Sequence, residues 1–385
     1  VGDLLAGLDW VAYNAKTYNI RIVNLSLSAG STSSWVNDPL AQAARAVVAS
    51  GIVVVTAAGN YGMTTGKITY GSVGAPGNDP SVITVGSSNM KLTTARGDDV
   101  VNNFSSRGPT RGSVTLSTGQ RVVDNLLKPD LVAPGNALIS AGSTSTLGQW
   151  NRLASNNAGL LAGLTGQVLN QTLMLLSGTS VSAPVVSGAV ALMLQANPGL
   201  TPPLVKAILQ YTATPLAQAN LLQQGAGQIN VAGAVRLAMA LRTDITSASE
   251  AGLLGTGASL LALGKTLPAP VTVLDGVPQP WSQIITVGGT HLATGPEAIT
   301  RWQPVYDGRL TWARQWVLRR DVSWQPASLR DGVPPLTVPS AIVERNAGAQ
   351  RLLSPGVRLL DALAPTLADG TAVLLTRSEE HTSEL

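Results

Sequence analysis

The sequence contains no cysteine, so it has neither a disulfide framework nor a thiolate metal site. Histidine is almost as scarce, because His291 and His381 are the only two imidazoles among 385 residues. Charged residues make up only 12% of the chain, and the net charge of +4 comes from 25 basic and 21 acidic residues. The arginines are scattered and form no run, so we expect no nucleic-acid partner.

An uninterrupted membrane-spanning segment is also missing. The longest uncharged stretch covers residues 153–205, and its part from Met174 to Leu194 is long enough to cross a bilayer. Pro184, several serines and two glycines interrupt that part. We therefore expect no membrane span here but a helix buried in the core of a globular protein.

What the sequence does contain is typical of a compact, turn-rich globular protein. Hydrophobic residues make up 44% of the chain, and 40 glycines and 23 prolines are spread through it. This composition supplies a core and excludes disorder driven by high net charge. The length is sufficient for two or three domains.

Both ends of the chain look unnatural. The sequence starts at Val1 with what reads as a helix in mid-domain, so we expect the natural N-terminus to be missing. Residues 377–385 resemble the translation of a common sequencing adapter, and we expect this tail to pack on nothing. Without the tail, His291 is the only imidazole left for chemistry.

The first half of the chain alternates between apolar strands and helices. Residues 20–27, 52–56 and 82–85 are rich in β-branched residues and read as strands. A helix is expected at residues 40–50, with Asp38 as N-cap, Pro39 at the first position and Gly51 after the end. This order predicts the α/β class, with a doubly wound, mostly parallel sheet.

Two further helices complete this α/β part, and the composition of the sequence then changes. Residues 180–195 read as a helix buried all round, and residues 202–211 read as a second helix. We place the end of the α/β domain at residue 235. Residues 236–376 are predicted to form a smaller, β-rich C-terminal module with many glycines and tryptophans, for which the sequence indicates no chemistry.

Ser180 is the first candidate for chemistry. It lies at the expected start of the buried helix, after Gly178, and we expect Pro184 in the first helical turn. A hydroxyl and backbone N–H at the positive end of a helix dipole could stabilise a developing oxyanion. The alternative is a helix start made of small residues because the core is crowded there.

Asn60 is the second candidate. It follows the strand at residues 52–56, at the sheet edge where ligand crevices open in parallel sheets. Its amide could donate to an oxyanion, whereas the alternative is an ordinary turn residue. If the two residues share a site, the Asn60 amide and the Ser180 hydroxyl should lie within about 8 Å of each other.

Five motifs occur in an order that resembles the subtilisin-like serine proteases. The motifs are Asn24-Leu25-Ser26-Leu27-Ser28, Ala57-Ala58-Gly59-Asn60, Phe104-Ser105-Ser106-Arg107-Gly108-Pro109, Lys128-Pro129-Asp130-Leu131-Val132-Ala133-Pro134-Gly135 and Gly178-Thr179-Ser180-Val181-Ser182-Ala183-Pro184. The resemblance covers about residues 1–232. It implies a serine endopeptidase with a subtilisin-like fold and a polypeptide substrate.

The resemblance also implies a role for each motif residue. Ser180 would be the nucleophile, and Asn60 would be the oxyanion donor together with the Ser180 N–H, supported by Gly178 and Thr179. The substrate-binding residues would be an edge that pairs with an extended peptide, Ser26, Leu27 and Ser28, and the wall of a roomy, apolar pocket, Ala57, Ala58 and Gly59. Ser28 departs from the glycine usual in the family, so the resemblance does not define the pocket width there.

The family's triad aspartate and the histidine of its His-Gly-Thr motif precede the part of the domain seen here, and the sequence has neither. We therefore expect a fragment that is inactive alone, and we expect a structural role for His291. The alternative is a non-catalytic, subtilisin-like peptide-binding or scaffolding module. A nucleotide-binding enzyme would depend on the glycines at 225–227 and 252–257, which lack the spacing and context of that motif.

Cofactors, location and assembly are less defined. The sequence identifies no cofactor and no metal ligands. Calcium binding is compatible with the resemblance, but no residues can be assigned to it. An extracellular or cell-envelope location is implied by the resemblance alone, and the oligomeric state stays open.

Overall fold

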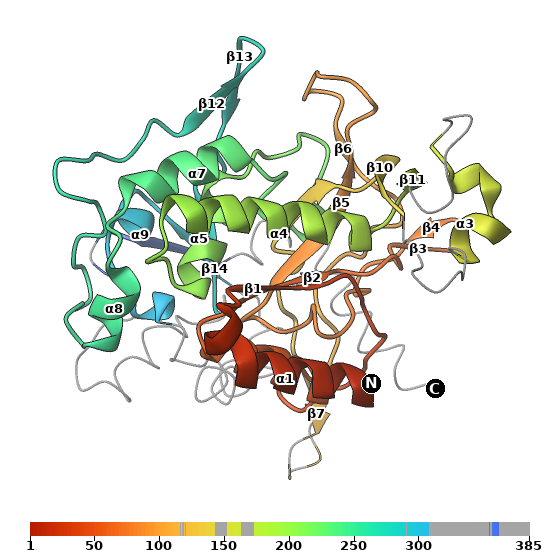
Figure 1. The fold of residues 1–385 in the computed structure, drawn as a ribbon, viewed down its shortest axis with the longest axis horizontal. Helices are drawn as coiled ribbons and strands as arrows, with labels where there is room; N and C mark the ends of the chain where they lie inside the picture. Colours follow the sequence, from red (N-terminus) through yellow and green to blue (C-terminus); the bar gives the residue numbers. More distant parts are fainter. Residues whose placement is uncertain are drawn as a thin grey trace, which may run out of the picture.

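The computed structural model describes residues 1–115, 121–142, 152–162, 173–289, 291–307 and 356–361, together with residues 117, 119 and 354. At its centre is a mostly parallel sheet in which the parallel strands follow the order β1–β2–β5–β9 (Figure 1). The short strand β6 pairs antiparallel with the end of β5. The strands are β1 (Ile22–Leu25), β2 (Val53–Ala57), β5 (Ile83–Asn89), β6 (Val100–Val101) and β9 (Leu131–Pro134). The predicted α/β class with a mostly parallel sheet is confirmed.

Helices cover both faces of this sheet, as expected for a doubly wound fold. One face packs against α4 (Thr179–Ala196), which also contacts α7 (Val231–Ala240), and α7 in turn packs on α5 (Pro202–Thr212). The other face packs against α1 (Gly2–Tyr18) and α2 (Pro39–Ala49). Successive residues of β2 alternate between two hydrophobic clusters, Val53 and Val55 on the α4 side and Val54 on the α2 side. Both faces of β2 are therefore buried, which explains its continuous apolar sequence.

Local signals set the limits of α2 where the sequence predicts them. The Asp38 carboxylate accepts hydrogen bonds from the N–H groups of Leu40 and Ala41, each at 3.0 Å. Pro39 is the first helical residue, and Gly51 has a φ of +93° just beyond the end. This helix is confirmed to within one residue.

The helix α4 starts earlier than expected and differs at its proline. Because α4 begins at Thr179, Pro184 is the sixth helical residue and lies in the helix interior, so its predicted place in the first turn is wrong. By length and composition α4 could also cross a membrane. It packs on four strands of the central sheet, which is the position of a core helix.

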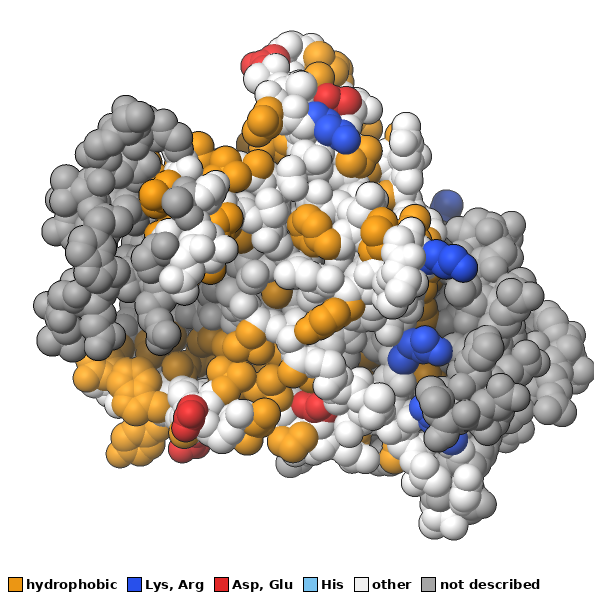
Figure 2. Space-filling model, turned by 90° about the vertical axis from the view of Figure 1, so that its right-hand side faces the viewer, with side chains coloured by type: hydrophobic (Ala, Val, Ile, Leu, Met, Phe, Trp, Pro, Cys, Tyr) orange, Lys and Arg blue, Asp and Glu red, His pale blue; other side chains and the backbone are white. Residues whose placement is uncertain are grey.

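The outer side of α1 is not packed on the described part of the chain. Its Leu8 is buried in the core, whereas Trp10, Tyr13 and Tyr18 are 53%, 87% and 63% exposed. Figure 2 shows the side of the molecule that is on the right in Figure 1, and hydrophobic side chains gather at its lower left. Among the described residues on this face, acidic side chains are few.

Beyond α7 the described chain forms small antiparallel sheets, which agrees with the predicted β-rich C-terminal region. One is the hairpin of β12 (Val271–Leu274) and β13 (Val277–Pro280), and the other has the order β14–β15–β16, with β14 (Ile284–Val287), β15 (His291–Thr294) and β16 (Arg358–Asp361). The division at residue 235 stays a prediction. Helix α7 crosses it, and Trp281 and Ile285 belong to the same hydrophobic cluster as Val53.

Short elements connect these parts. The paired strands are β3 (Met63–Thr64) with β4 (Lys67–Ile68), β7 (Ser113–Thr115) with β8 (Arg121–Val123), and β10 (Leu138–Ala141) with β11 (Leu173–Leu176). The short helices are α3 (Arg152–Asn156), η1 (Ala158–Leu160), α6 (Leu221–Gln224), α8 (Ile245–Glu250), α9 (Glu297–Thr300) and η2 (Pro304–Tyr306). The tail at residues 377–385 lies outside the described residues.

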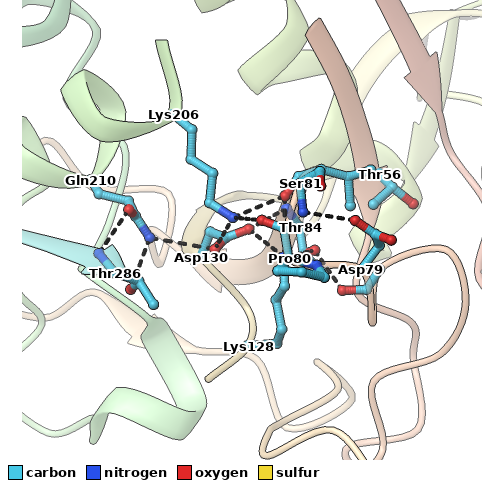
Figure 3. A network of polar contacts seen from close by, with 12 residues as sticks. Thr56, Asp79, Pro80, Ser81, Thr84, Lys128, Asp130, Lys206, Gln210 and Thr286 are labelled. Atoms are coloured by element: carbon cyan, nitrogen blue, oxygen red, sulfur yellow. Dashed lines mark hydrogen bonds and ion pairs between the residues drawn. The ribbon is translucent and has the colours of Figure 1, made fainter. Parts of the chain in front are cut away.

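A buried ionic cluster joins the sheet to α5 (Figure 3). The Asp130 carboxylate, directly before β9, binds the ammonium groups of Lys128 and Lys206, each at 2.8 Å. Lys128 also donates to Thr84 Oγ1 at 2.8 Å, and both lysines donate to the Val82 carbonyl at 3.1 Å. Because every group in this cluster has partners, it fixes β5 and β9 relative to α5.

The cluster continues into the C-terminal region through Gln210. The Gln210 amide donates to Thr286 Oγ1 at 3.1 Å and accepts from the Thr286 N–H at 3.1 Å (Figure 3). Burial alone would raise the pKa of Asp130, but Lys128 and Lys206 outweigh it and hold that pKa below its ordinary value. Burial also lowers the pKa of Lys128, to about 7.

The lowered pKa of Lys128 predicts how stability changes with pH. Between about pH 7 and the ordinary lysine pKa of 10.5, the unfolded chain holds a proton that the folded chain has released, so stability rises with pH. We expect the free energy of unfolding to increase over this window by at most about 1.4 kcal/mol per pH unit, the slope for one proton. Urea titrations at several pH values would measure it. Lys128→Met should flatten the slope, whereas Lys67→Met, which removes an exposed lysine, should keep it; an equal slope in both variants would contradict this assignment.

Candidate active site

Ser180 lies near the carboxyl edge of the central sheet. It is the second residue of α4 and is partly exposed. The N-cap, Gly178, has φ +152° and ψ +160°, a region that residues with a side chain essentially do not adopt. The Gly178 N–H donates to the carbonyl of Gly135, directly after β9, at 2.8 Å. Since the first N–H groups of a helix have no partner in the helix, the Ser180 N–H is available for a ligand.

Asn60 lies just beyond the carboxyl end of β2, and its orientation is fixed by Thr179. Its Oδ1 accepts hydrogen bonds from the Thr179 N–H at 2.9 Å and from the Thr179 hydroxyl at 3.0 Å. The Thr179 Oγ1 in turn accepts from the Gly59 N–H at 3.1 Å. Because Oδ1 is used in this way, the Asn60 Nδ2 is the atom that can donate to a ligand.

The Ser180 hydroxyl and the Asn60 amide face the same space across Gly178. A Cβ placed on Gly178 would lie 3.2 Å from Ser180 Oγ and 3.4 Å from Asn60 Nδ2. These distances allow at most about 7 Å between the two atoms, so the predicted proximity is confirmed. The absence of a side chain at Gly178 leaves this space open.

The residues expected to form the peptide-binding edge follow β1 closely, but they are not a regular strand. β1 ends at Leu25, two residues before the predicted end of that strand, and the Leu27 N–H donates to the Leu25 carbonyl at 2.7 Å. The exposed Ser26 donates its hydroxyl to the Ser180 carbonyl at 2.7 Å. The edge at residues 26–28 is thus in direct contact with the start of α4.

The expected pocket wall lies beside this edge. Ala57 and Ala58 are buried, and Gly59 has a φ of +108°. A Cβ on Gly59 would approach the hydroxyl oxygens of both Ser28 and Ser106 to 2.9 Å. The Ser28 hydroxyl therefore lies beside Gly59, and the roomy pocket stays a prediction.

Ser106 is a site-supporting residue to which the sequence assigns no role. Its hydroxyl accepts from the Tyr61 N–H at 3.1 Å, and its own N–H donates to the Gly59 carbonyl at 2.9 Å. It thereby holds the turn that carries Asn60. The sequence signal for Ser106 was the motif at residues 104–109, but this motif does not indicate which segment it contacts.

No metal site accompanies these residues in the described part of the chain, which contains no group of three or more His, Asp or Glu side chains that could hold an ion. His291 lies in β15, which pairs with β14 and β16 and not with the central sheet. It is buried, at 8% exposure. This position favours the structural role expected for it.

Replacement of Gly178 tests the geometry of this site. Gly178→Ala forces a side chain into a backbone region essentially limited to glycine, so we expect the free energy of unfolding to fall by about 1–3 kcal/mol. Gly188→Ala is the matched control in the same helix. An added Cβ there meets no atom within 4 Å, so we expect a gain of about 0.5–1 kcal/mol. Chemical denaturation of both variants measures these changes. A higher free energy of unfolding in both variants would contradict the backbone conformation described for Gly178.

Comparison with known proteins agrees with these observations. The family model of the subtilase family matches residues 3–227. The serine protease AprX of Bacillus subtilis (strain 168) is 31% identical over 240 residues, which are 61% of this chain and 48% of the relative. Subtilisin amylosacchariticus of Bacillus subtilis subsp. amylosacchariticus is 30% identical over 233 residues, 60% of this chain and 44% of the relative. The chain therefore belongs to the subtilase family.

The chain spans about half the length of these curated relatives. Among solved structures, fervidolysin of Fervidobacterium pennivorans, a keratinolytic enzyme related to subtilisin, matches with 22% identity and a TM-score of 0.43. The match covers 60% of this chain and 28% of that protein.

Proposed function

We propose that the protein is a serine endopeptidase that hydrolyses peptide bonds through an acyl-enzyme on Ser180. The observation that carries the proposal is the shared space between the Ser180 hydroxyl and the Asn60 amide at the N-terminus of α4. The oxyanion that forms when Ser180 attacks a peptide carbonyl would accept hydrogen bonds from the Ser180 N–H and from Asn60 Nδ2. Gly178 leaves room for it, and Thr179 orients the amide.

The substrate in this proposal is an extended polypeptide. It would bind along Ser26, Leu27 and Ser28 by backbone hydrogen bonds, with Ala57, Ala58 and Gly59 as the wall of the pocket for the residue before the scissile bond. The position of the Ser28 hydroxyl beside Gly59 favours a narrower pocket than the small residues alone suggest. We therefore expect a preference for small side chains at that position of the substrate.

The general base would come from sequence upstream of Val1. A serine hydroxyl is a poor nucleophile until an imidazole takes its proton, and the sequence offers only His291 and His381. His291 lies in the C-terminal antiparallel sheet, and His381 lies outside the described residues. The 385-residue chain is therefore proposed to be inactive alone. We call this sequence preceded by its natural upstream residues the extended chain.

Hydrolysis of a quenched-fluorescence peptide with alanine before the scissile bond tests the function. We expect the extended chain to cleave it and the 385-residue chain to leave it intact. The alternative is a non-catalytic peptide-binding module, whose upstream sequence would lack the aspartate and the His-Gly-Thr motif. Binding of the peptide by the extended chain without cleavage would support that alternative.

The location is a proposal from the family resemblance. An extracellular or cell-envelope location would bring the enzyme to polypeptide substrates outside the cell. We propose no nucleic-acid partner, because the basic residues form no run along the sequence.

A further inference from the structure

Pro184 deprives the Ser180 carbonyl of its partner within α4. In an α-helix each carbonyl accepts a hydrogen bond from the N–H four residues later. Four residues after Ser180 stands Pro184, which has no N–H. The helix therefore leaves unpaired the carbonyl of the very residue that carries the candidate nucleophile.

The hydroxyl of Ser26 takes the place of the missing donor. Ser26 follows the end of β1, and its Oγ donates to the Ser180 carbonyl at 2.7 Å. Two more side chains fix the direction of this hydroxyl. The Asn24 Nδ2 donates to Ser26 Oγ at 2.9 Å, and the Ser187 hydroxyl donates to Asn24 Oδ1 at 2.9 Å. Because Ser26 Oγ accepts from Asn24, its own proton is left for the Ser180 carbonyl.

We propose that Ser26 is a positioning residue for Ser180, replacing the N–H that Pro184 lacks and tying the start of α4 to the end of β1. The inference deepens the proposed function and rests on it, since it gives the Ser26 side chain a task separate from pairing with substrate. Thr179 is already held by Asn60 on one side of the site, and Ser26 holds the next residue. The first turn of α4 is thereby anchored at two consecutive residues. Such anchoring matters because small misplacements of a reacting group are costly in rate.

A double-mutant cycle between Ser26 and Pro184 tests the proposal in the extended chain. Ser26→Ala should lower kcat/KM for the quenched peptide about tenfold, through kcat and with KM nearly unchanged. In a Pro184→Ala background residue 184 regains an N–H for the Ser180 carbonyl, so the same substitution should cost less than about twofold. Each comparison is made within one background, so the effect of Pro184→Ala itself cancels.

Two further variants separate positioning from general effects. Ser26→Thr keeps a hydroxyl and should retain most of the activity. Ser247→Ala removes a serine hydroxyl that donates to the Asp244 carbonyl in α8 at 3.0 Å, and it should leave kcat/KM unchanged. An equal loss on Ser26→Ala in both backgrounds, or a loss carried by KM alone, would overturn the positioning role.

Urea unfolding of the four proteins in this cycle tests the inference independently of the proposed function. The free energy of unfolding needs no turnover, and Ser26→Ala should be more destabilising with Pro184 than with Pro184→Ala. If this coupling is present but no variant cleaves peptide, the proposed function fails and the replacement of the missing N–H stands. If the coupling is absent, the inference is overturned whether or not the chain is active.

Discussion

Ser180→Ala in the extended chain should lower kcat for peptide hydrolysis by about 10⁶-fold, a magnitude known from a subtilisin and so borrowed from the family. The physical reason is that the acyl-enzyme cannot form without the hydroxyl, while the oxyanion donors remain. Those donors and the peptide-binding edge should retain a small residual rate and nearly unchanged peptide binding. Hydrolysis of the quenched peptide would give the residual rate, and fluorescence anisotropy would give the affinity for peptide.

Ser182→Ala is the matched control for this substitution. Ser182 is also in the first turns of α4, but it is buried and its hydroxyl donates to the Gly178 carbonyl at 3.4 Å. We expect its loss to change kcat far less than the loss of Ser180. Comparable activity in the Ser180→Ala variant and the unsubstituted chain would remove Ser180 from the mechanism.

Asn60→Ala should lower kcat by about 10²–10³-fold, or about 2.7–4 kcal/mol of transition-state stabilisation. This range comes from the equivalent loss in a subtilisin, so it too is borrowed from the family. The expectation depends on Asn60 Nδ2, which Thr179 turns toward the space beside Ser180. Because the bound substrate carries no oxyanion, which forms only in the transition state and the tetrahedral intermediate, KM should stay nearly unchanged. Steady-state kinetics over a range of peptide concentrations separates the two parameters.

The control for Asn60 is an asparagine on the opposite side of the sheet. Asn14 in α1 donates to the Trp10 carbonyl at 2.8 Å, and Asn14→Ala should leave kcat unchanged. A rise in KM with constant kcat in Asn60→Ala would mean that the amide binds substrate and does not stabilise the transition state.

Features that depend on neighbouring residues in the sequence were predictable. The helix α2 was found to within one residue because Asp38, Pro39 and Gly51 each act on the backbone beside them. The strand β2 was found because both of its faces are buried, which makes its sequence continuously apolar. Ser180 and Asn60 were singled out because motifs mark the ends of such elements.

Features that depend on contacts between distant segments were not predictable. Lys128 and Asp130 were quoted only as part of a motif, and nothing local indicates that Lys206 shares the same carboxylate. In the same way, the Ser26 hydroxyl meets the Ser180 carbonyl across 154 positions of sequence. We also expected Pro184 in the first turn, but it is the sixth residue of α4, and the Ser180 carbonyl that it leaves without a helical donor accepts from Ser26, a residue of a distant segment.

Fluorophosphonate labelling followed by mass spectrometry tests the central claim most directly, because the probe reacts with a serine hydroxyl that an adjacent base has activated. We predict one adduct on Ser180 in the extended chain, none on the extended chain with Ser180→Ala, and none on the 385-residue chain. Rapid labelling of the 385-residue chain would show that it contains a base for Ser180, with His291 the first residue to replace. An extended chain that carries the upstream histidine and aspartate and stays unlabelled would contradict the claim that Ser180 is a nucleophile.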